Sequence, residues 1–413
     1  MAPAPSSRRQ SSSVTFKGGL DRPFHRWFRL TPSYSPELVY DWLSEHPPTP
    51  GLPLLDPFLG AGTTCISAAS RGVPSIGFEI NPFLAFVART SCDWSIPAPQ
   101  LVALRDDVLA MCSDWLANGP QDTKAFADSI GTRLPIIHNV FRWWRPDVLR
   151  ELVAIRHAIA ACGQDGDQHL RLALAQIVYP TASITLGRLQ LAFKDRSNDD
   201  IDALGLWTDA VNLIADDLEA GVPDSVGDTW VVNADSRMLD LPTDTAIGGV
   251  FCSPPYPNRY SYVWNTRPHL YLLELIDTPR AATEIDLKTI GGTWGTATTR
   301  LQKGEIDPLP RVSDALGDVL NRLATKSLLM RNYVCKYFND LDAHLEVLVT
   351  RLAANAAVGY VVGNTETNGI MVDTQHVLAD LLDMHGLHDI GIEPLRTRNS
   401  GAGLIEATVF GSA

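Results

Sequence analysis

The fold is decided by the stretch Leu54-Leu55-Asp56-Pro57-Phe58-Leu59-Gly60-Ala61-Gly62-Thr63-Thr64. Its apolar beginning predicts a buried strand, and a helix is expected to begin around Thr63. Between them, Gly60 and Gly62 carry no side chain, so a ligand can approach the backbone where the first helical turn exposes unpaired N–H groups. The alternative, a tight turn that only connects strand to helix, stays open for this loop taken alone.

Two acidic residues at later strand ends strengthen the case for a binding site. Glu79 follows Gly60 by 19 residues and ends the second predicted strand, where a carboxylate can accept hydrogen bonds from two ribose hydroxyls. Asp235 ends the third predicted strand and can accept from an adenine amino group at the same crevice. The loop lacks the GxxxxGK[ST] pattern that cradles a triphosphate. A nucleoside without a phosphate chain therefore fits the site better.

Short β-branched runs that end in Gly, Pro or Asp alternate with helical patterns, which predicts an α/β fold with a parallel sheet. We expect a seven-stranded, mostly parallel sheet of the Rossmann-like kind. The last two strands are close enough along the chain for an antiparallel edge pair. The strands are expected at residues 53–57, 74–79, 229–234, 246–252, 358–363, 389–394 and 404–410.

The chain divides into four expected regions. Residues 1–23 should form a flexible basic tail, because Ser, Pro and Arg without periodic apolar positions bury too little surface. The sheet domain comprises residues 24–95 and 229–413, interrupted by a mostly helical insertion at 96–228. Residues 257–330 within the sheet domain are expected to be an irregular region that binds substrate. In the amphipathic helix expected at 201–220, the acidic residues should point outward; they are Asp202, Asp209, Asp216, Asp217 and Glu219.

The segment Ser253-Pro254-Pro255-Tyr256 follows the fourth predicted strand. Two consecutive prolines fix φ and remove two N–H donors, so the carbonyl of Pro254 can project into the crevice as a rigid acceptor. The Ser253 hydroxyl can accept a second hydrogen bond, and Tyr256 offers a flat face for a base. This arrangement suits an exocyclic amine on a nucleobase, which a duplex presents only when the base is flipped out. Taken alone, the segment can also be an ordinary proline-rich turn.

Taken together, these residues resemble the amino-directed DNA methyltransferases that use S-adenosylmethionine. Residues 56–64 resemble the cofactor motif of that family, 78–82 its ribose motif and 253–256 its catalytic motif. Residues 25–43 are similar to the helix that closes over the methionine end of the cofactor. Residues 337–364 and 372–410 are similar to the fifth strand with its preceding helix and to the closing strand pair. The resemblance implies a class I methyltransferase fold.

The resemblance also implies roles for individual residues. Ser253, Pro254, Pro255 and Tyr256 are expected to be catalytic. The residues expected to bind S-adenosylmethionine are Asp56, Pro57, Phe58, Gly60, Gly62, Thr63, Thr64, Glu79, Ile80, Asn81, Asp235, Ser236 and Ser253.

A Ser at the first position of the tetrapeptide is more usual in enzymes similar to N4-cytosine methyltransferases. We therefore expect methyl transfer to the N4 amine of a cytosine flipped out of double-stranded DNA. The resemblance makes restriction-modification a plausible setting, with a cognate restriction endonuclease as a partner. An N6-adenine DNA methyltransferase, an RNA methyltransferase and a non-catalytic nucleic-acid-binding relative stay open as alternatives.

Contacts to DNA phosphates are expected from local basic clusters, each of which can also be a surface ion pair. One cluster surrounds Trp143-Trp144, one lies at residues 188–196, and one flanks the catalytic segment. The catalytic loop is also expected to hold or replace the flipped base, and the GGTWG turn to contact the target strand. The residues expected to contact DNA are Arg142, Arg145, Asn258, Arg259, Tyr260, Arg267 and Trp294.

The charge of the chain is unevenly distributed. Its 413 residues contain 34 basic and 47 acidic side chains, a net charge of −13 that at first speaks against a polyanionic partner. Residues 1–30, however, hold six basic residues and one acidic residue, whereas residues 201–250 hold one basic residue and ten acidic ones. The sequence therefore predicts a bipolar molecule with a basic catalytic face and an acidic back.

Membrane segments and metal motifs are not expected. No apolar run approaches the ~18 to 20 residues of a membrane helix, and the N-terminal residues lack the apolar core of a signal peptide. The six cysteines lie far apart without a CxxC pair, so they are expected to be reduced thiols, mostly in the core, and to bind no metal. We expect a cytoplasmic protein; the oligomeric state stays unassigned.

Overall fold

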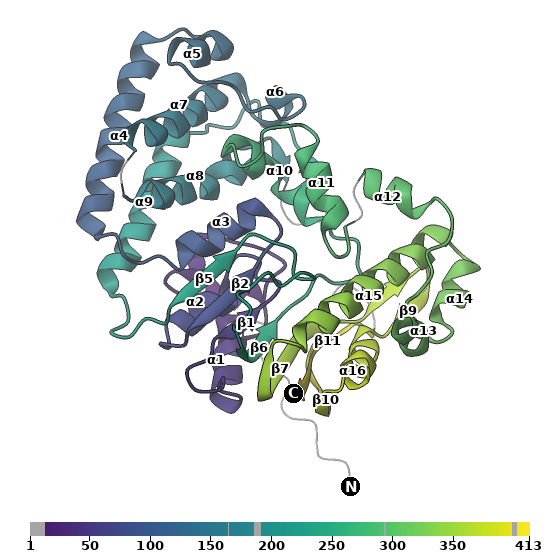
Figure 1. Cartoon of the computed structure of the whole chain (residues 1–413). Helices are drawn as coiled ribbons and strands as arrows, with labels where there is room; N and C mark the ends of the chain where they lie inside the picture. The colour runs from purple at the N-terminus through teal and green to yellow at the C-terminus, as the bar shows by residue number, and fades with distance from the viewer. Residues whose placement is uncertain (1–12, 164, 186–190, 293–294, 399–402) are drawn as a thin grey trace.

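The computed structural model describes residues 13–163, 165–185, 191–292, 295–398 and 403–413. Its centre is a seven-stranded sheet in the order β10-β11-β7-β6-β1-β2-β5 (Figure 1). The strands are β1 (Leu54–Asp56), β2 (Ser75–Phe78), β5 (Thr229–Val232), β6 (Ile247–Cys252), β7 (Leu352–Gly363), β10 (His388–Thr397) and β11 (Ile405–Ser412). Each of these strands overlaps one that the sequence predicted.

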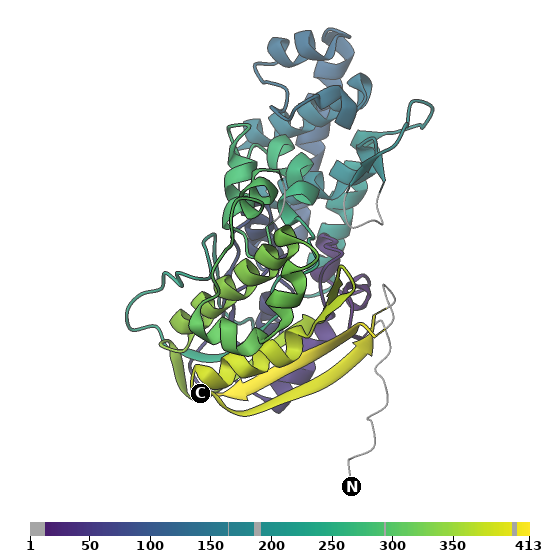
Figure 2. The ribbon, with the colours of Figure 1, turned by 90° about the vertical axis from the view of Figure 1, so that its right-hand side faces the viewer.

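The sheet is parallel except for one strand. The strands from β7 across to β5 pair in parallel, and β11 pairs antiparallel with both β7 and β10. Figure 2 shows the long β10 and β11 in yellow along the side that faces the viewer. The expected α/β fold, with a mostly parallel seven-stranded sheet and an antiparallel last strand, is confirmed.

Successive residues of the central strands enter cores on opposite faces of the sheet. Leu54 and Phe251 pack with residues of α1 (Pro36–Glu45) and α2 (Thr63–Ala69). Their neighbours Leu55 and Val250 pack with residues of α15 (Leu328–Leu348) and α16 (Thr374–Met384). Because helices cover both faces, the parallel strands read as continuous apolar runs in the sequence.

The helical lobe, residues 96–228, lies above the β5 side of the sheet in Figure 1. Its core is continuous with that of α3 (Pro82–Ser91) and α10 (Tyr262–Leu272), so the lobe is packed onto the sheet domain. Its elements are α4 (Ala98–Asn118), α5 (Thr123–Ser129), α6 (Val140–Trp143), α7 (Pro146–Cys162), α8 (Asp167–Thr181), β3 (Ile184–Thr185), β4 (Ala192–Phe193) and α9 (Ala203–Ala220).

One acidic residue of α9 does not point outward as expected. Asp217 is 1% exposed, and its carboxylate accepts hydrogen bonds from the backbone N–H of Phe24 (3.2 Å) and the indole N–H of Trp27 (2.9 Å). The Arg26 guanidinium also binds it, at 2.5 Å. The expectation was wrong because these partners lie about 190 positions away in the sequence, where helical periodicity carries no information about them.

The predicted tail at residues 1–23 is too long. Val14 is 1% exposed and packs in the same core as Leu38, and Thr15 forms an antiparallel bridge with Tyr34. A short 3-10 helix, η2 (Phe16–Gly19), follows, and Arg22 forms an ion pair with Glu37. Residues 13–23 are therefore part of the packed structure, although their few apolar positions show no period in the sequence.

Residues 257–330 are not the irregular region that the sequence predicted. Besides α10, they contain α11 (Ala281–Lys288), α12 (Thr296–Leu301), α13 (Pro310–Leu316) and α14 (Val319–Ala324). None of these four helices exceeds eight residues, so each offers only about two turns of apolar periodicity to a sequence reading. Figure 1 shows α10 and α11 beside the helical lobe and α12 to α14 beside α15.

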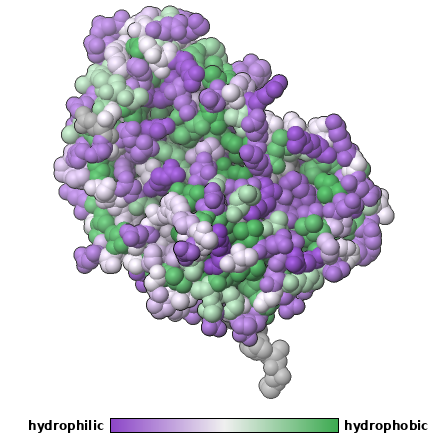
Figure 3. Space-filling view, viewed as in Figure 1, coloured by the Kyte–Doolittle hydropathy of each residue, from purple (hydrophilic) through white to green (hydrophobic). Residues whose placement is uncertain are grey.

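The surface carries mixed hydrophilic and hydrophobic side chains on the face in Figure 3, and its outline is indented between the helical lobe and the α12 region. Among the helices of the described residues, none combines the length and apolarity that crossing a bilayer requires. The six cysteines are free, and four of them are buried.

Candidate functional site

A pocket lies at the carboxyl ends of β1, β2, β5 and β6, on both sides of the point where the strand order reverses. Its volume is about 770 Å³, counting the part open to solvent. The predicted site residues that line it are Pro57, Phe58, Gly60, Thr63, Glu79, Ile80, Asn81, Asp235, Ser236, Ser253 and Pro255. Asp56, Gly62, Thr64, Pro254 and Tyr256 are outside its lining.

Gly60 and Gly62 shape the loop between β1 and α2 in different ways. Both have a left-handed backbone, with φ of +56° and +99°, which glycine adopts without a steric penalty. Gly60 lines the pocket, as the sequence predicted. Gly62 is the N-cap of α2, and a Cβ there would approach the Cα of Ala88 to 3.1 Å. Gly62 therefore permits close packing of α2 on α3.

Asp56 and Thr64 support the loop from below the pocket. The buried Asp56 carboxylate accepts hydrogen bonds from the backbone N–H of Phe58 (2.9 Å) and from the hydroxyls of Tyr34 (3.1 Å) and Thr64 (2.5 Å). Burial raises the pKa of Asp56 to about 6, and these hydrogen bonds oppose the increase. The two residues thus position the start of α2 instead of lining the pocket.

Glu79 stands at the end of β2 and faces the glycine loop. One carboxylate oxygen accepts the N–H of Gly60 (2.9 Å) and the other accepts the N–H of Asn81 (2.8 Å). Burial raises its pKa to about 7 despite both hydrogen bonds. An ionised carboxylate has about four acceptor positions, so Glu79 can still accept from a ligand hydroxyl.

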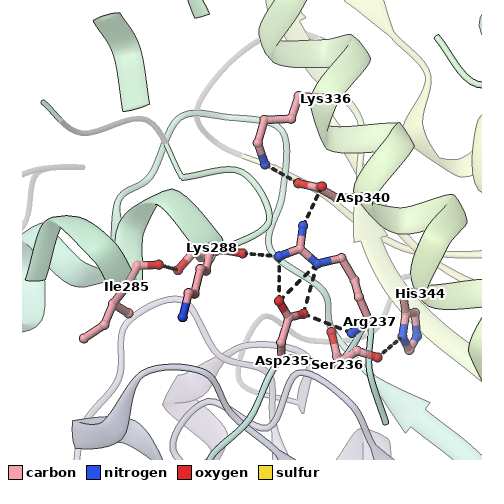
Figure 4. Close-up of polar contacts among 9 residues, drawn as sticks. Asp235, Ser236, Arg237, Ile285, Lys288, Lys336, Asp340 and His344 are labelled. Atoms are coloured by element: carbon pink, nitrogen blue, oxygen red, sulfur yellow. Dashed lines mark hydrogen bonds and ion pairs between the residues drawn. The ribbon is translucent and has the colours of Figure 1, made fainter. Parts of the chain in front are cut away.

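Asp235 and Ser236 line the pocket where β5 ends, and both are tied to α15 (Figure 4). The Arg237 guanidinium binds the Asp235 carboxylate at 2.6 Å and Asp340 of α15 at 2.6 Å. Burial alone would raise the pKa of Asp235, but the hydrogen bonds from Arg237 hold it below its usual value. The backbone carbonyl of Ser236 contacts His344 Nδ1 at 3.0 Å. Asp235 therefore stays ionised as a hydrogen-bond acceptor beside the pocket.

Ser253 and Pro255 bring the catalytic segment predicted from the sequence into the same pocket. The Ser253 hydroxyl donates its proton to the backbone carbonyl of Val361 on β7 (3.0 Å). A hydroxyl has one proton and two lone pairs, so toward a substrate Ser253 can act only as an acceptor while this bond holds. The direction of this bond is compatible with an acceptor role for Ser253, which stays a prediction.

Tyr256 lies beyond the pocket lining, at the ends of β7 and β11. Its hydroxyl donates to Glu406 Oε1 (2.7 Å), and Arg396 binds the other oxygen of Glu406 at 2.5 Å. The Arg398 guanidinium lies 5.4 Å from the ring centroid. A Cβ on Gly363 would lie 3.0 Å from the Tyr256 ring, so the ring would have to shift if any other residue stood there. These contacts hold the ring in one orientation.

The loop that follows Tyr256 is held by its own backbone and by α15. The Asn258 side chain accepts the N–H of Tyr260 (3.1 Å), and the exposed Arg259 has a left-handed backbone with φ of +61°. The Tyr333 hydroxyl accepts the N–H of Arg259 at 3.0 Å. A non-glycine residue in this conformation costs about 1–3 kcal/mol, and such strain clusters at functional sites.

The two cations beside Trp143-Trp144 have different surroundings. Arg142 is exposed, and its guanidinium lies 3.9 Å from the ring centroid of Phe193. Arg145 binds Asp147 at 2.5 Å and donates to the backbone carbonyl of Asp199 at 2.5 Å. Arg145 therefore stabilises the chain that follows β4, whereas the guanidinium of Arg142 is exposed at the surface.

Arg267 is packed between aromatic rings of two elements. Its guanidinium lies 4.9 Å from the ring centroid of Trp264 and 6.0 Å from that of Trp143, and burial lowers its pKa. These contacts link α10 to the helical lobe. Trp294 and Arg188, also named from the sequence, lie outside the described residues.

Two parts of the pocket wall had no predicted site residues. Leu30, Ser33 and Tyr34 approach from the segment between the 3-10 helix η3 (His25–Trp27) and α1, where the sequence resemblance implied a single closing helix. On the opposite wall, Lys288 and Ile290 come from the end of α11. Residue spacing gave no signal for α11, because its contact with the pocket depends on a partner far away in the sequence.

Metal ligands are not gathered in the structure: among the described residues, no group of three or more His, Cys, Asp or Glu side chains can hold an ion.

Comparisons with known proteins give a short match to methyltransferases. A type II methyltransferase of Geobacillus stearothermophilus, M.BsoBI, is 38% identical over 69 residues, which is 17% of this chain and 14% of the relative. M.AvaI of Nostoc sp. and of Anabaena variabilis is 32% identical over 69 residues, with the same coverage.

The matched stretch thus spans about a seventh of the length of these curated relatives, at 14% of each. No protein-family model and no solved structure matches the chain. The short matches support a relationship to type II methyltransferases.

Proposed function

We propose that this chain transfers a methyl group from S-adenosylmethionine to the exocyclic N4 amine of a cytosine flipped out of duplex DNA. One observation carries the proposal: Ser253 and Pro255 of the catalytic segment line the same pocket as Gly60 and Glu79. A nucleoside cofactor and an amine held by the serine hydroxyl would therefore meet in one space.

The pocket residues fit S-adenosylmethionine by their chemistry. The free acceptor positions of Glu79 suit the two ribose hydroxyls, and the negative charge of Asp235, whose oxygens already accept hydrogen bonds from Arg237, favours an adenine amino group nearby. Hydroxyl groups of the pocket wall suit the polar methionine end; they belong to Thr63 at the start of α2 and to Ser33 and Tyr34 between η3 and α1. When bound, the cofactor supplies a methyl group that is already activated on a sulfonium.

The chain's own contribution is to orient the amine. Ser253 Oγ accepts one N–H of the amine because its own proton is used by Val361, and the Pro254 carbonyl accepts the other. Tyr256, fixed by Glu406, stacks against the base. Positioning the two reactants is the main source of rate in such a transfer.

Cysteine chemistry plays no part in the proposal. A C5-cytosine enzyme needs a thiolate that attacks the ring. Cys252, directly before the catalytic segment, is fully buried in the core with Val250 and Tyr360, and burial raises its pKa well above the usual value. The exocyclic amine is therefore the favoured acceptor over C5, and Ser at position 253 favours cytosine N4 over adenine N6 by the resemblance noted above.

The proposed partner is double-stranded DNA, with cytoplasmic methylation in restriction-modification as the setting. The relatives that match part of the chain are type II methyltransferases, which supports this setting. A cognate restriction endonuclease is the partner that such a setting implies.

Transfer of labelled methyl groups tests the proposal. The purified chain is incubated with methyl-labelled S-adenosylmethionine and, separately, with genomic DNA of low methylation or with total RNA. We expect label in DNA and none in RNA. Binding of the cofactor without transfer to either nucleic acid would instead favour a non-catalytic nucleic-acid-binding protein.

Cofactor affinity should depend on pH through Glu79. Ribose hydroxyls donate to the ionised carboxylate, so Glu79 must lose its proton before it can bind them. Burial raises the pKa of Glu79 to about 7, so this proton is lost around neutral pH. The affinity for S-adenosylhomocysteine should rise about tenfold from pH 6 to pH 8, because the ionised fraction rises by that factor. Calorimetric titration across this range measures it. Glu79→Gln should bind more weakly with no such slope; an unmodified chain whose affinity falls with rising pH contradicts the assignment.

Arg259 should contribute one phosphate contact. Its guanidinium is exposed beside the catalytic segment, so Arg259→Ala should reduce the slope of log affinity for duplex DNA against log salt by about 1. Fluorescence anisotropy with a labelled duplex at several salt concentrations gives the slope. Arg71→Ala is the matched control, because Arg71 is also exposed but follows the far end of α2. A slope equal to that of the unmodified chain would exclude Arg259 from the interface.

A further inference from the structure

Helix α11 contacts both the proposed cofactor pocket and the catalytic loop, defined as residues 256–261; Tyr262, the first residue of α10, lines the pocket itself. Its C-terminal end contributes Lys288 to the pocket wall, and Thr289 and Ile290, which follow the helix, line the pocket as well. Only Ala282 and Asp286 of its eight residues are buried. Because α11 buries so little apolar surface, its position depends on polar anchors at particular atoms.

The first anchor is Arg237, which does not line the pocket itself. Its guanidinium donates to the backbone carbonyl of Lys288 at 2.7 Å, in addition to its ion pairs with Asp235 and Asp340 (Figure 4). Lys336 binds the same Asp340, so α15 holds the far side of the network. Arg237 therefore ties the last turn of α11 to a pocket residue on one side and to the long, buried α15 on the other.

The second anchor joins α11 to the catalytic loop. The Ser261 hydroxyl donates to Asp286 Oδ1 at 2.9 Å, and both residues are buried, at 3% and 1% exposure. Ser261 also accepts the N–H of Trp264 and so caps α10. It follows Tyr256 by five residues. A shift of α11 would therefore move the loop that carries the proposed base-stacking residue.

The turn after α11 leaves little room for independent movement. A Cβ on Gly292 would lie 1.9 Å from the carbonyl oxygen of Asp286, so the chain folds back tightly on the helix. At Gly291, with φ of +74°, a Cβ would lie 3.9 Å from the Cβ of the catalytic Pro255. The end of α11 is thus in close proximity to the catalytic segment as well as to the pocket.

We propose that Arg237 is a positioning residue that fixes α11 over the cofactor, and that α11 couples occupancy of the cofactor pocket to the catalytic loop through Asp286 and Ser261. The inference rests on the proposed function, because the ligand that occupies the pocket is S-adenosylmethionine. It goes beyond that function by assigning roles to residues that touch neither the pocket nor the target base.

Hydrogen exchange of the full chain, with and without S-adenosylhomocysteine, tests the coupling. In the unmodified chain, the ligand should slow exchange in three places: residues 60–66 around the glycine loop, α11, and the catalytic loop. In Arg237→Gln, residues 60–66 should remain protected, whereas ligand-induced protection of α11 and of the catalytic loop should be lost. Affinity for the ligand should fall about 2- to 30-fold, the usual range for such coupling.

Asp340→Asn and Ser261→Ala separate the two anchors. Asp340 is outside the pocket lining, so its replacement should weaken protection of α11 only through Arg237. Ser261→Ala should retain protection of α11 and lose that of the catalytic loop. Arg351→Gln, which removes hydrogen bonds to the carbonyls of Pro242 and Thr243, is the matched control and should behave like the unmodified chain.

The outcomes distinguish the coupling from the proposed function. If the unmodified chain binds no S-adenosylhomocysteine, the proposed cofactor is wrong and the inference is overturned with it. If the unmodified chain binds the ligand and Arg237→Gln shows the same affinity and the same protection of α11, the cofactor assignment stands and the role of Arg237 is overturned.

Discussion

Replacing Ser253 and Tyr256 together by alanine is expected to lower kcat/KM for methyl transfer about 30- to 10³-fold. Loss of base stacking removes about 1–3 kcal/mol, and loss of the Ser253 acceptor about 1 kcal/mol more. Tyr256 lies outside the pocket lining, whereas Ser253 lines the pocket, so Tyr256→Ala alone should change the binding of S-adenosylhomocysteine little and any loss in the double variant should come from Ser253. Single-turnover transfer to duplex DNA and calorimetric titration of the ligand measure the two quantities independently.

Tyr256→Phe is the matched control for this variant. It keeps the aromatic face and removes only the hydrogen bond from the hydroxyl to Glu406, which is 2.7 Å long in the structure. We expect a loss of less than about tenfold, because a single hydrogen bond of this kind contributes about 1 kcal/mol. If the double variant transfers methyl groups at the rate of the unmodified chain, residues 253–256 are not catalytic.

Replacing Asp217 by alanine is expected to reduce the free energy of unfolding by about 3–5 kcal/mol. The change leaves the backbone N–H of Phe24 and the indole N–H of Trp27 without their acceptor, and both lie in the buried core. It also removes the partner of Arg26. Since a domain is typically stable by only about 5–15 kcal/mol, the unfolding midpoint in urea should fall sharply.

Asp216→Ala provides the control at the adjacent position. Asp216 has the same charge and lies on the same helix but is exposed, so its replacement should change stability by less than about 0.5 kcal/mol. Equal midpoints for the two variants would show that the buried carboxylate does not hold residues 24–27 on the helical lobe.

The sheet was predictable from the sequence because its parallel strands are buried on both faces. Leu54-Leu55 and Val250-Phe251 supply apolar side chains to opposite cores, and such runs are recognisable without knowledge of their partners. The pocket was predictable for a related reason. Glu79 and Ser253 follow strands directly, Gly60 lies in the loop after β1, and parallel strands bring their carboxyl ends together.

Residues whose roles depend on distant partners were not predictable. Asp217 resembles every other acidic residue of α9 until the structure places Trp27 beside it. Arg267 was expected to contact phosphate, but its position between Trp264 and Trp143 depends on how α10 packs on the helical lobe. Likewise, nothing in the sequence around Lys288 indicates that Arg237 binds its carbonyl.

The uneven charge of the chain has a more specific meaning in the structure. Of the basic residues near the N-terminus, Arg22 is paired with Glu37 and Arg26 with Asp217. Part of the positive charge at that end is therefore used to bind the segment to α1 and α9. Arg142 and Arg259 are exposed, which makes them the stronger candidates for contact with DNA.

Identification of the methylated nucleoside tests the central claim most directly. Duplex DNA treated with the chain and S-adenosylmethionine is digested to nucleosides and analysed by mass spectrometry against authentic standards. The proposal predicts N4-methyldeoxycytidine, with much less formed at the same early time by the Ser253→Ala, Tyr256→Ala double variant. N6-methyldeoxyadenosine as the product would contradict the assignment of the target base, and unmodified nucleosides would contradict the proposed activity itself.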